Sequence, residues 1–211
     1  MRVRSDFERM SDLGFIHHFE PGKSERTLLL LHGTGGNEHG LIDLGRAIDP
    51  DAALLSPRGK VLENGAPRFF RRLAEGVFDE ADVVRRAREL ASFVESGCAA
   101  YKIDPSQLVA VGYSNGANIA AAMMLLGVAT FRSAILLRPM VPLSQLENQP
   151  DLNGTKALLS GGKFDPIAPV PIVEALGELM GRFGTAVTTQ IRESGHELTT
   201  ADVMAAREWL A

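Results

Sequence analysis

Residues 112–116 read Gly-Tyr-Ser-Asn-Gly, a Gly-x-Ser-x-Gly pentapeptide that stands between two apolar stretches. The run at 108–111, Leu-Val-Ala-Val, is short and contains β-branched valines, which predicts a buried strand. The run at 117–126 is rich in Ala, Met and Leu, which predicts a helix. A serine on a tight strand-to-helix turn takes strained backbone angles that push its hydroxyl out above the sheet, and the helix N-terminus behind it favours negative charge. We therefore interpret Ser114 as a nucleophile.

A serine hydroxyl is a weak nucleophile at neutral pH, so this interpretation requires a general base. Among the five histidines, His196 is the strongest candidate, because it lies in a loop between the apolar run 186–191 and the last predicted helix. Loops beyond strand ends are where α/β enzymes place catalytic side chains. An ordinary loop or helix-cap histidine is the alternative. His17 and His18 are expected to be surface and packing residues.

An acid that orients the histidine should follow a strand and should lie between the serine and the histidine in the chain. Asp165 meets both conditions, since it comes after the apolar run 157–160 and two glycines. Pro166 favours an extended conformation for it. Asp151 is the rival, but its surroundings predict an exposed turn before the strand. In another interpretation, compatible with the first, Asp165 is the N-cap of the helix that begins near Pro169.

The glycine-rich segment 32–38, His-Gly-Thr-Gly-Gly-Asn-Glu, follows an apolar strand predicted at 28–31. Glycines in such a loop let backbone N–H groups face a developing oxyanion. We expect the two donors to be the N–H of Thr34 and the N–H of Asn115. A loop that cradles phosphate is the alternative, although the segment matches neither of the common glycine-rich phosphate-binding motifs.

These residues together resemble the α/β-hydrolase superfamily, and within it the small phospholipase/carboxylesterase group. The resemblance covers nearly the whole chain and rests on a glycine-rich loop followed by Ser, Asp and His motifs in that order, at residues 31–36, 112–116, 162–166 and 195–198. Residues 56–59 and 68–72 are also similar to the bacterial carboxylesterase branch of the group. The resemblance implies catalytic Ser114, Asp165 and His196, no metal or cofactor, and a small-molecule ester as substrate.

One residue departs from the pattern of this group. Acyl-thioesterase relatives commonly carry glutamine where this chain has Asn115. The backbone N–H survives that change, so the departure bears on substrate preference. The favoured function is a serine carboxylesterase that hydrolyses short- to medium-chain carboxylic esters through an acyl-enzyme on Ser114. The alternatives are a thioesterase or lysophospholipase with the same triad, and a non-catalytic hydrolase-fold protein that binds a ligand.

Composition agrees with one compact enzyme domain over residues 1–211. The chain has 211 residues, 45% of them apolar, and a net charge of −4, which gives no reason to expect nucleic-acid binding. The single cysteine, Cys98, forms no internal disulfide and fits a reducing compartment. The first residues lack the apolar run of a signal peptide and no stretch reaches membrane-spanning length, so we expect a cytoplasmic protein without stable membrane insertion. A homodimer is left open.

Strand and helix patterns alternate along the chain, which predicts an α/β-hydrolase fold with about seven mostly parallel strands, helices on both faces and no cap domain. The strands are predicted at residues 15–19, 27–31, 53–56, 108–111, 133–137, 156–160 and 186–191. The helices are predicted at residues 79–96, directly after Ser114, at 169–180 and at 199–209.

Two insertions interrupt this alternation. Residues 57–78 are too long for a simple connection and should arch over the sheet edge that carries Ser114. Residues 138–153 are only long enough for a loop, where many relatives carry a helical cap, so we expect an open groove. The candidates for contact with the substrate are Phe69, Phe70, Arg71, Met140, Val141 and Ile167. Arg71 or Arg72 could favour a substrate with a carboxylate, although solvated surface arginines are the simpler interpretation.

Overall fold

A seven-stranded sheet forms the centre of the computed structural model, which describes residues 13–146 and 148–211. The N-terminal residues on which the expected lack of a signal peptide rests lie outside this part of the chain. The strands are β1 (His17–Glu20), β2 (Thr27–Leu31), β3 (Ala53–Pro57), β8 (Leu108–Tyr113), β9 (Ser133–Leu137), β10 (Lys156–Gly162) and β11 (Ala186–Arg192). Their order in the sheet is β1-β3-β2-β8-β9-β10-β11. The edge strand β1 pairs antiparallel with β3 and all other neighbours are parallel, which confirms the predicted mostly parallel sheet.

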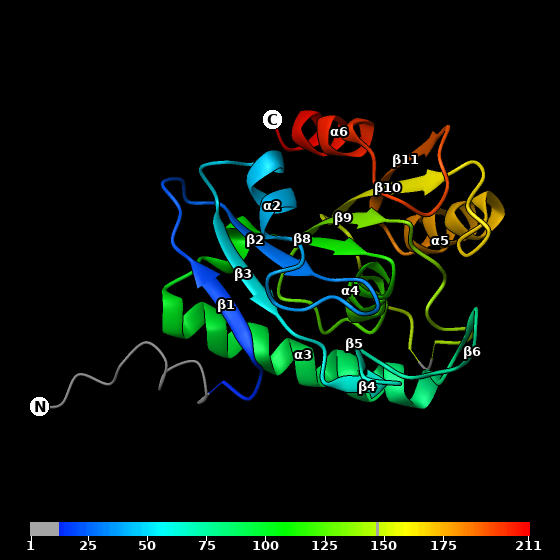
Figure 1. Cartoon of the computed structure of the whole chain (residues 1–211), viewed down its shortest axis with the longest axis horizontal. Helices are drawn as coiled ribbons and strands as arrows, with labels where there is room; N and C mark the ends of the chain where they lie inside the picture. Colours follow the sequence, from blue (N-terminus) through cyan, green and yellow to red (C-terminus); the bar gives the residue numbers. More distant parts are fainter. Residues whose placement is uncertain (1–12, 147) are drawn as a thin grey trace, which may run out of the picture.

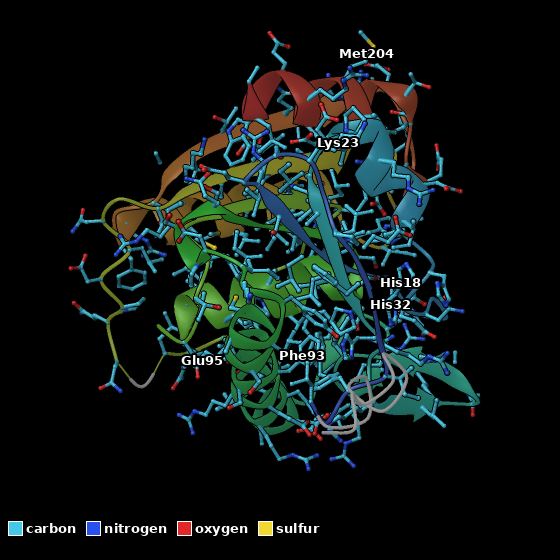
Figure 2. The ribbon with its side chains drawn as sticks, turned by 90° about the vertical axis from the view of Figure 1, so that its left-hand side faces the viewer. His18, Lys23, His32, Phe93, Glu95 and Met204 are labelled. Atoms are coloured by element: carbon cyan, nitrogen blue, oxygen red, sulfur yellow. The ribbon has the colours of Figure 1, made fainter. Side chains whose placement is uncertain are left out.

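Helices cover both faces of the sheet (Figure 1). They are α2 (Ile42–Ile48), α3 (Glu80–Tyr101), α4 (Asn115–Leu125), α5 (Val170–Arg182) and α6 (Thr200–Leu210), with a short 3₁₀ turn η1 (Pro105–Gln107). In the view of Figure 2, α6 with Met204 lies on one side of the sheet and α3 with Phe93 and Glu95 lies on the other. The short helix α2 was not predicted. None of the helices among the described residues is long and apolar enough to cross a membrane.

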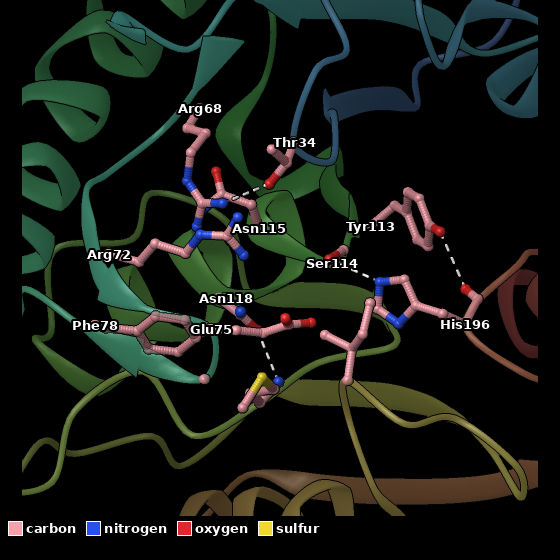
Figure 3. A pocket seen from close by; sticks show the side chains of 13 residues that line it. Thr34, Arg68, Arg72, Glu75, Phe78, Tyr113, Ser114, Asn115, Asn118 and His196 are labelled. Carbon is pink, nitrogen blue, oxygen red and sulfur yellow. Dashed lines mark hydrogen bonds between the residues drawn. The ribbon is translucent and has the colours of Figure 1, made fainter. Parts of the chain in front are cut away.

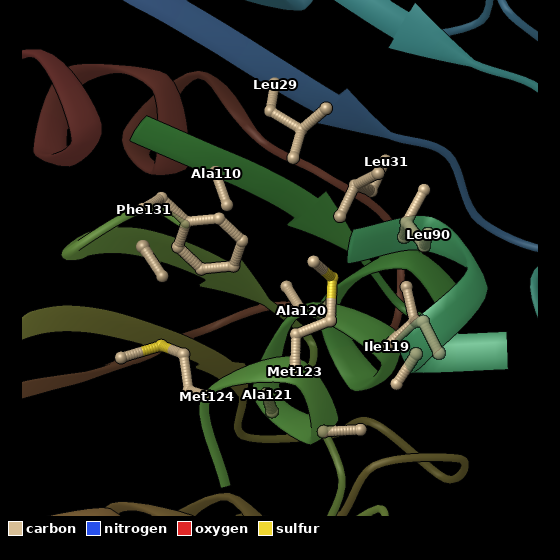
Figure 4. Packing of buried hydrophobic residues seen from close by; sticks show 14 of the residues in the cluster. Leu29, Leu31, Leu90, Ala110, Ile119, Ala120, Ala121, Met123, Met124 and Phe131 are labelled. Atoms are coloured by element: carbon tan, nitrogen blue, oxygen red, sulfur yellow. The ribbon is translucent and has the colours of Figure 1, made fainter. Parts of the chain in front are cut away.

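Alternate side chains of the central strands enter two separate cores. Leu28 and Leu30 of β2 pack in the cluster that includes residues of α2 and α6. Leu29 and Leu31 pack in the cluster that includes α3, α4 and α5 (Figure 4). Strands that are buried on both faces read as continuous apolar runs, because neither face alternates with solvent. The run 28–31 has this form for that reason.

The 57–78 insertion contains regular structure that the sequence analysis did not predict. It forms two small hairpins, one of β4 (Val61–Glu63) with β5 (Ala66–Arg68) and one of β6 (Arg72–Ala74) with β7 (Val77–Phe78). Asn64 and Gly65 both have positive φ at the first turn, as a tight hairpin requires. Between β9 and β10 the described residues form no helix or strand, in agreement with the predicted lack of a cap domain.

Candidate active site

Ser114 occupies the turn between β8 and α4 in a strained backbone conformation. Its φ of 50° and ψ of −113° are rarely adopted by a residue with a side chain. A Cβ atom on Gly112 would lie 2.6 Å from the backbone of Ala117, and a Cβ atom on Gly116 would lie 1.8 Å from the carbonyl oxygen of Leu31. Close contact between the strands and α4 therefore requires both glycines, as the pentapeptide predicts.

The structure brings Ser114, His196 and Asp165 together in one series of hydrogen bonds. The distance from His196 Nε2 to Ser114 Oγ is 2.9 Å, and the distance from His196 Nδ1 to Asp165 Oδ2 is 2.8 Å. The histidine lies in the loop between β11 and α6, and the aspartate lies in the loop between β10 and α5. The carboxylate accepts from Nδ1–H, so Nε2 is the nitrogen that can take a proton from the serine hydroxyl.

Three further hydrogen bonds hold this series in place. Oδ1 of Asp165 accepts hydrogen bonds from the backbone N–H groups of Ile167 at 2.8 Å and Ala168 at 2.9 Å. The hydroxyl of Tyr113 donates to the carbonyl oxygen of His196 at 3.0 Å. Asp165 is only 5% exposed, so its carboxylate is held by hydrogen bonds in a site with little water. Such a carboxylate keeps its orientation and stabilises a protonated histidine.

Neither the rival acid, Asp151, nor the helix N-cap role of Asp165 agrees with the structure. Asp151 is exposed and accepts hydrogen bonds from Asn153, its neighbour in a turn before β10. The N-cap of α5 is Pro169, so Asp165 caps the turn that precedes the helix and not the helix itself. The other histidines lie elsewhere. His17 is buried against Tyr101, and His18 pairs with Glu20, which agrees with packing and surface roles.

Thr34 lies in the glycine-rich loop after β2 and lines the same pocket as Ser114 and Asn115 (Figure 3). Among the described residues, no backbone carbonyl accepts a hydrogen bond from the Thr34 N–H. Asn115 is the first residue of α4, where the leading N–H groups have no partner within the helix. Both N–H groups are therefore available to an acceptor beside the serine. The side-chain hydroxyl of Thr34 is already engaged, since it accepts from Arg68 at 2.7 Å.

A buried histidine holds the glycine-rich loop against the first insertion. His32 Nδ1 donates to the carbonyl oxygen of Gly33 at 2.6 Å, and Nε2 accepts from the N–H of Gly59 at 3.0 Å. Burial lowers the pKa of His32, and the hydrogen bond to Gly33 opposes this only in part. The neutral ring is the form that can accept from Gly59. His32 is therefore a positioning residue for the loop that carries Thr34.

Two asparagines of α4 hold the two insertions beside Ser114. Oδ1 of Asn115 accepts from the N–H of Phe69 at 2.7 Å, and Oδ1 of Asn118 accepts from the N–H of Met140 at 2.7 Å. Only the backbone N–H of Asn115 was predicted to have a role in catalysis. Its side chain also fixes the start of the chain segment that forms one wall of the pocket.

The most deeply buried charged group near the site, Arg138, was not among the predicted residues. Arg138 directly follows β9, has a φ of 54° and is 0% exposed. It forms an ion pair with Asp202 of α6 at 2.9 Å. It also donates to Ser194 Oγ, to the carbonyl oxygen of Gly195 and to the carbonyl oxygen of Glu197, at 3.1, 3.1 and 2.8 Å. These three acceptors lie in the loop that carries the histidine.

Asp202 completes this cluster. Burial raises its pKa, but hydrogen bonds from Arg138, Ser160 and Thr199 outweigh burial and lower the pKa to about 2. The carboxylate is thus ionised across the neutral range. Its contacts with Thr199 form the capping box at the start of α6. A capping box is visible in the sequence, but nothing in the sequence connects Asp202 to Arg138.

The pocket at Ser114 has a volume of about 360 Å³. Its lining residues are Thr34, Arg68, Arg72, Glu75, Gly76, Phe78, Tyr113, Ser114, Asn115, Asn118, Met140, Ile167 and His196. The pocket is partly open, in agreement with the open groove that we expected from the lack of a cap domain. Phe78, Met140 and Ile167 supply apolar wall, and Arg68, Arg72 and Glu75 supply charge.

Four of the predicted substrate contacts need correction, since only Met140 and Ile167 of the six line the pocket. Phe69 and Phe70 lie in the connection between β5 and β6, are 3% and 0% exposed, and pack in the core with α3 and α4. Arg71 is exposed and hydrogen-bonded to Asp79. Val141 packs against the core. The arginines that do line the pocket, Arg68 and Arg72, flank these positions.

Within residues 13–146 and 148–211, no group of three or more His, Cys, Asp or Glu side chains is arranged to hold a metal ion. The site described above consists of a serine hydroxyl, an imidazole, a carboxylate and backbone donors. These groups are the set used in nucleophilic acyl transfer.

A mostly parallel seven-stranded sheet with a strained serine on the turn after its central strand defines an α/β hydrolase. Residues 19–211 match the family described as Phospholipase/Carboxylesterase, and the chain belongs to this family. It is 47% identical over 193 residues to MhqD of Bacillus subtilis (strain 168), whose name describes it as a hydrolase. The match covers 92% of this chain and 96% of MhqD.

Solved structures agree with this assignment. The carboxylesterase of Bacillus cereus has 42% sequence identity, a TM-score of 0.93 and coverage of 98% of both chains. The structure of YahD with malic acid has 31% identity, a TM-score of 0.86 and coverage of 92% of this chain and 96% of that one. The fold and the hydrolase family of this chain are therefore known, and its substrate is the open question.

Proposed function

We propose that this protein is a serine carboxylesterase that hydrolyses short- to medium-chain carboxylic esters through an acyl-enzyme on Ser114. The observation that supports this most directly is the hydrogen-bonded series from Ser114 through His196 to Asp165, with distances of 2.9 and 2.8 Å. Membership in a family of phospholipases and carboxylesterases supports the same reaction class.

In the first step of the proposed reaction, Ser114 Oγ attacks the ester carbonyl carbon and its proton passes to His196 Nε2. The carbonyl oxygen becomes an oxyanion that accepts hydrogen bonds from the N–H groups of Thr34 and Asn115. Asp165 keeps the ring oriented and stabilises the imidazolium. The imidazolium then gives its proton to the alcohol oxygen as the C–O bond breaks, which leaves the acyl group on Ser114.

In the second step, His196 takes a proton from water, and the resulting hydroxide attacks the acyl carbon. A second tetrahedral oxyanion forms against the same two N–H groups. It collapses to the free acid, and the proton returns from His196 to Ser114 Oγ. The same groups would cleave a thioester or a lysophospholipid, so a thioesterase or lysophospholipase remains the second candidate. The residue at position 115, asparagine here and commonly glutamine in thioesterase relatives, bears on this choice of substrate.

The substrate is proposed to be small, because the pocket is about 360 Å³ and its apolar wall is limited to a few side chains. Burial is worth about 0.8 kcal/mol per methylene, so kcat/KM should increase over the first few acyl carbons and then level off. YahD was solved with malic acid, a small carboxylic acid, which is in keeping with a small substrate for this chain.

A series of p-nitrophenyl esters with acyl chains of increasing length, measured alongside acyl-coenzyme A thioesters, tests this proposal. We expect hydrolysis of the esters, with kcat/KM highest for short to medium chains and lower for the thioesters. A value that keeps increasing through long acyl chains would contradict the substrate range and favour a lipase. Absence of hydrolysis of every ester and thioester would instead favour the non-catalytic ligand-binding alternative.

A further inference from the structure

One wall of the pocket carries two arginines that the proposed reaction does not use. Arg68 on β5 and Arg72 on β6 lie beside Thr34 and Asn115 in Figure 3, while His196 lies on the far side of Ser114. Arg68 is only 3% exposed. Its Nη1 donates to Thr34 Oγ1 at 2.7 Å and its Nε donates to the carbonyl oxygen of Phe70 at 3.2 Å. The guanidinium is therefore held in a fixed position next to the proposed oxyanion site.

The positive charge of this wall is only partly balanced. Arg68 and Arg72 share one carboxylate, that of Glu63, at 3.3 Å and 2.8 Å. Burial lowers the pKa of Arg68, and Glu63 only opposes this effect. A buried cation that shares its counter-ion is stabilised by a further anion. Because the wall faces a pocket, such an anion could enter from solvent.

Asn115 adds an unused donor to the same wall. Its Oδ1 is identified by the hydrogen bond from the N–H of Phe69 at 2.7 Å, so the other side-chain atom is the amide nitrogen. This Nδ2 is buried and has no hydrogen-bond partner among residues 13–146 and 148–211, while Asn115 as a whole is 2% exposed and lines the pocket. Buried donors are almost always paired. An unpaired donor at a pocket wall indicates an acceptor on the bound ligand.

We propose that Arg68, Arg72 and the side-chain amide of Asn115 form a subsite for a carboxylate, and that the substrate is an ester that carries a free carboxylate a few bonds from its reacting carbonyl. This inference rests on the proposed esterase function and specifies its substrate class. Guanidinium groups and an amide N–H are donors only, and two arginines match the two oxygens of a carboxylate. The backbone N–H of Asn115 is proposed to bind the oxyanion, and the side chain of the same residue is proposed to bind the carboxylate. The free carboxylate and the reacting carbonyl of the substrate must therefore lie close together.

Glu75 is the charged group that opposes this binding. It lies on the turn between β6 and β7, lines the same pocket and is exposed. In Figure 3 it lies beside Asn118 and Phe78, away from Thr34. Its negative charge repels a substrate carboxylate, and solvent weakens this repulsion because Glu75 is exposed. Glu75→Gln should therefore improve kcat/KM for a charged ester several-fold, with a much smaller effect on a neutral ester.

The test compares esters of equal length with and without the carboxylate. Monoethyl glutarate against ethyl pentanoate places the charge on the acyl side, and 3-acetoxypropanoate against propyl acetate places it on the alcohol side. We expect the wild-type protein to prefer the charged ester in at least one pair, by about ten-fold or more in kcat/KM, as for one charge-assisted contact. The pair that shows the preference identifies the side of the ester that carries the carboxylate.

The variants Arg72→Gln and Arg68→Lys should remove most of this preference, measured as the ratio of kcat/KM for the charged ester to kcat/KM for its neutral counterpart. Arg72 is half-buried, so its variant has the lower risk of misfolding, and thermal unfolding checks both. Arg46→Gln on α2 is the matched control, because Arg46 is exposed, pairs with Glu20 and carries the same charge far from the pocket. It should leave the preference unchanged.

Calorimetric binding of monoethyl glutarate and 3-acetoxypropanoate to Ser114→Ala provides a readout that does not depend on hydrolysis. We expect binding of the charged ester that the wild type prefers, and weaker binding when Arg72→Gln is added. If neutral esters are hydrolysed but neither charged ester is preferred or bound, the carboxylate subsite is wrong and the esterase proposal stands. If no ester is hydrolysed but a charged ester binds through Arg72, the esterase proposal is wrong and the subsite stands.

Discussion

The guanidinium of Arg138 and the carboxylate of Asp202 form a bidentate ion pair with both side chains 0% exposed, Nη1 to Oδ1 and Nη2 to Oδ2 at 2.9 Å each. The same guanidinium holds three acceptors in the loop of His196. Taking two charges out of water is costly and is offset only when their hydrogen bonds are satisfied. Here the satisfied pair connects the end of β9 to the start of α6 and fixes the loop between them.

Acid stability follows from the pKa of Asp202, which is about 2 in the folded protein against an ordinary value of 3.8. The folded value is the lower one, so the ionised group stabilises the fold above about pH 4, and this contribution is lost as the pH falls towards 2. Such a shift corresponds to on the order of 2 kcal/mol. In urea unfolding across this range, the stability advantage of the wild type over Asp202→Asn should therefore shrink as the pH falls. An advantage that stays constant from pH 5 to pH 2 would contradict this.

The proposed roles of His196 as base and Asp165 as acid predict how strongly substitutions at these residues lower kcat. His196→Ala should lower kcat on a short ester nearly as much as loss of Ser114, because members of such a triad act as a unit. Asp165→Asn should also be severe, since the carboxylate would no longer accept from Nδ1–H, but it should leave more residual activity. Asp151→Asn is the control, because Asp151 lies in an exposed turn. If Asp151→Asn were the most damaging of the three, the acid would be misassigned.

Two substitutions at Thr34 distinguish a role of its backbone N–H from a role of its side chain. Thr34→Pro removes the N–H that is proposed to hold the oxyanion, and loss of one such donor costs about 2.7–4 kcal/mol of transition-state stabilisation. Thr34→Ala keeps the N–H and should retain most activity on a neutral ester, although it removes the acceptor of Arg68. Steady-state kinetics of both variants, with circular dichroism to confirm folding, make the comparison. An inactive but folded Thr34→Ala would assign the role to the side chain.

The turn geometry predicts that Gly116 tolerates no side chain. Gly116→Ala would place a Cβ atom 1.8 Å from the carbonyl oxygen of Leu31, and backbone on both sides prevents a small shift. We expect the variant to be insoluble or to unfold at a much lower temperature. Gly181→Ala is the matched control, since a Cβ there meets nothing within 4 Å and the residue lies in α5. Alanine is favoured over glycine in a helix by about 1 kcal/mol, so this control should unfold at an equal or higher temperature.

Much of the fold could be predicted because its strands are buried on both faces. Runs such as 28–31 and 157–159 have no polar alternation, which is the pattern of a parallel sheet between helix layers. The serine turn was equally visible, because the contacts of Gly112 and Gly116 restrict these positions to glycine. The hairpins at 61–68 and 72–78 were missed, since their strands are only two or three residues long. Strands this short have no period to detect.

The candidate site was predictable in its reacting groups but not in its surroundings. Ser114, Asp165 and His196 each follow a strand, so a parallel sheet brings them to one edge. Phe69 and Phe70 were placed at the pocket because aromatic residues in an insertion resemble a binding surface, whereas the core buries them. Arg138 pairs with Asp202, which is far away in the chain. A pattern of neighbouring residues cannot predict such a contact. The expected cytoplasmic location remains a prediction.

The central claim is that Ser114 is the nucleophile of an esterase. The most direct measurement is hydrolysis of a short p-nitrophenyl ester, together with labelling by a fluorophosphonate, for the wild type and for Ser114→Ala. We predict that the variant loses both the label and activity, by about a thousand-fold or more, with an unchanged thermal unfolding temperature because only one small hydroxyl is removed. A folded Ser114→Ala that keeps more than a few per cent of wild-type activity, or that is still labelled, would contradict the account.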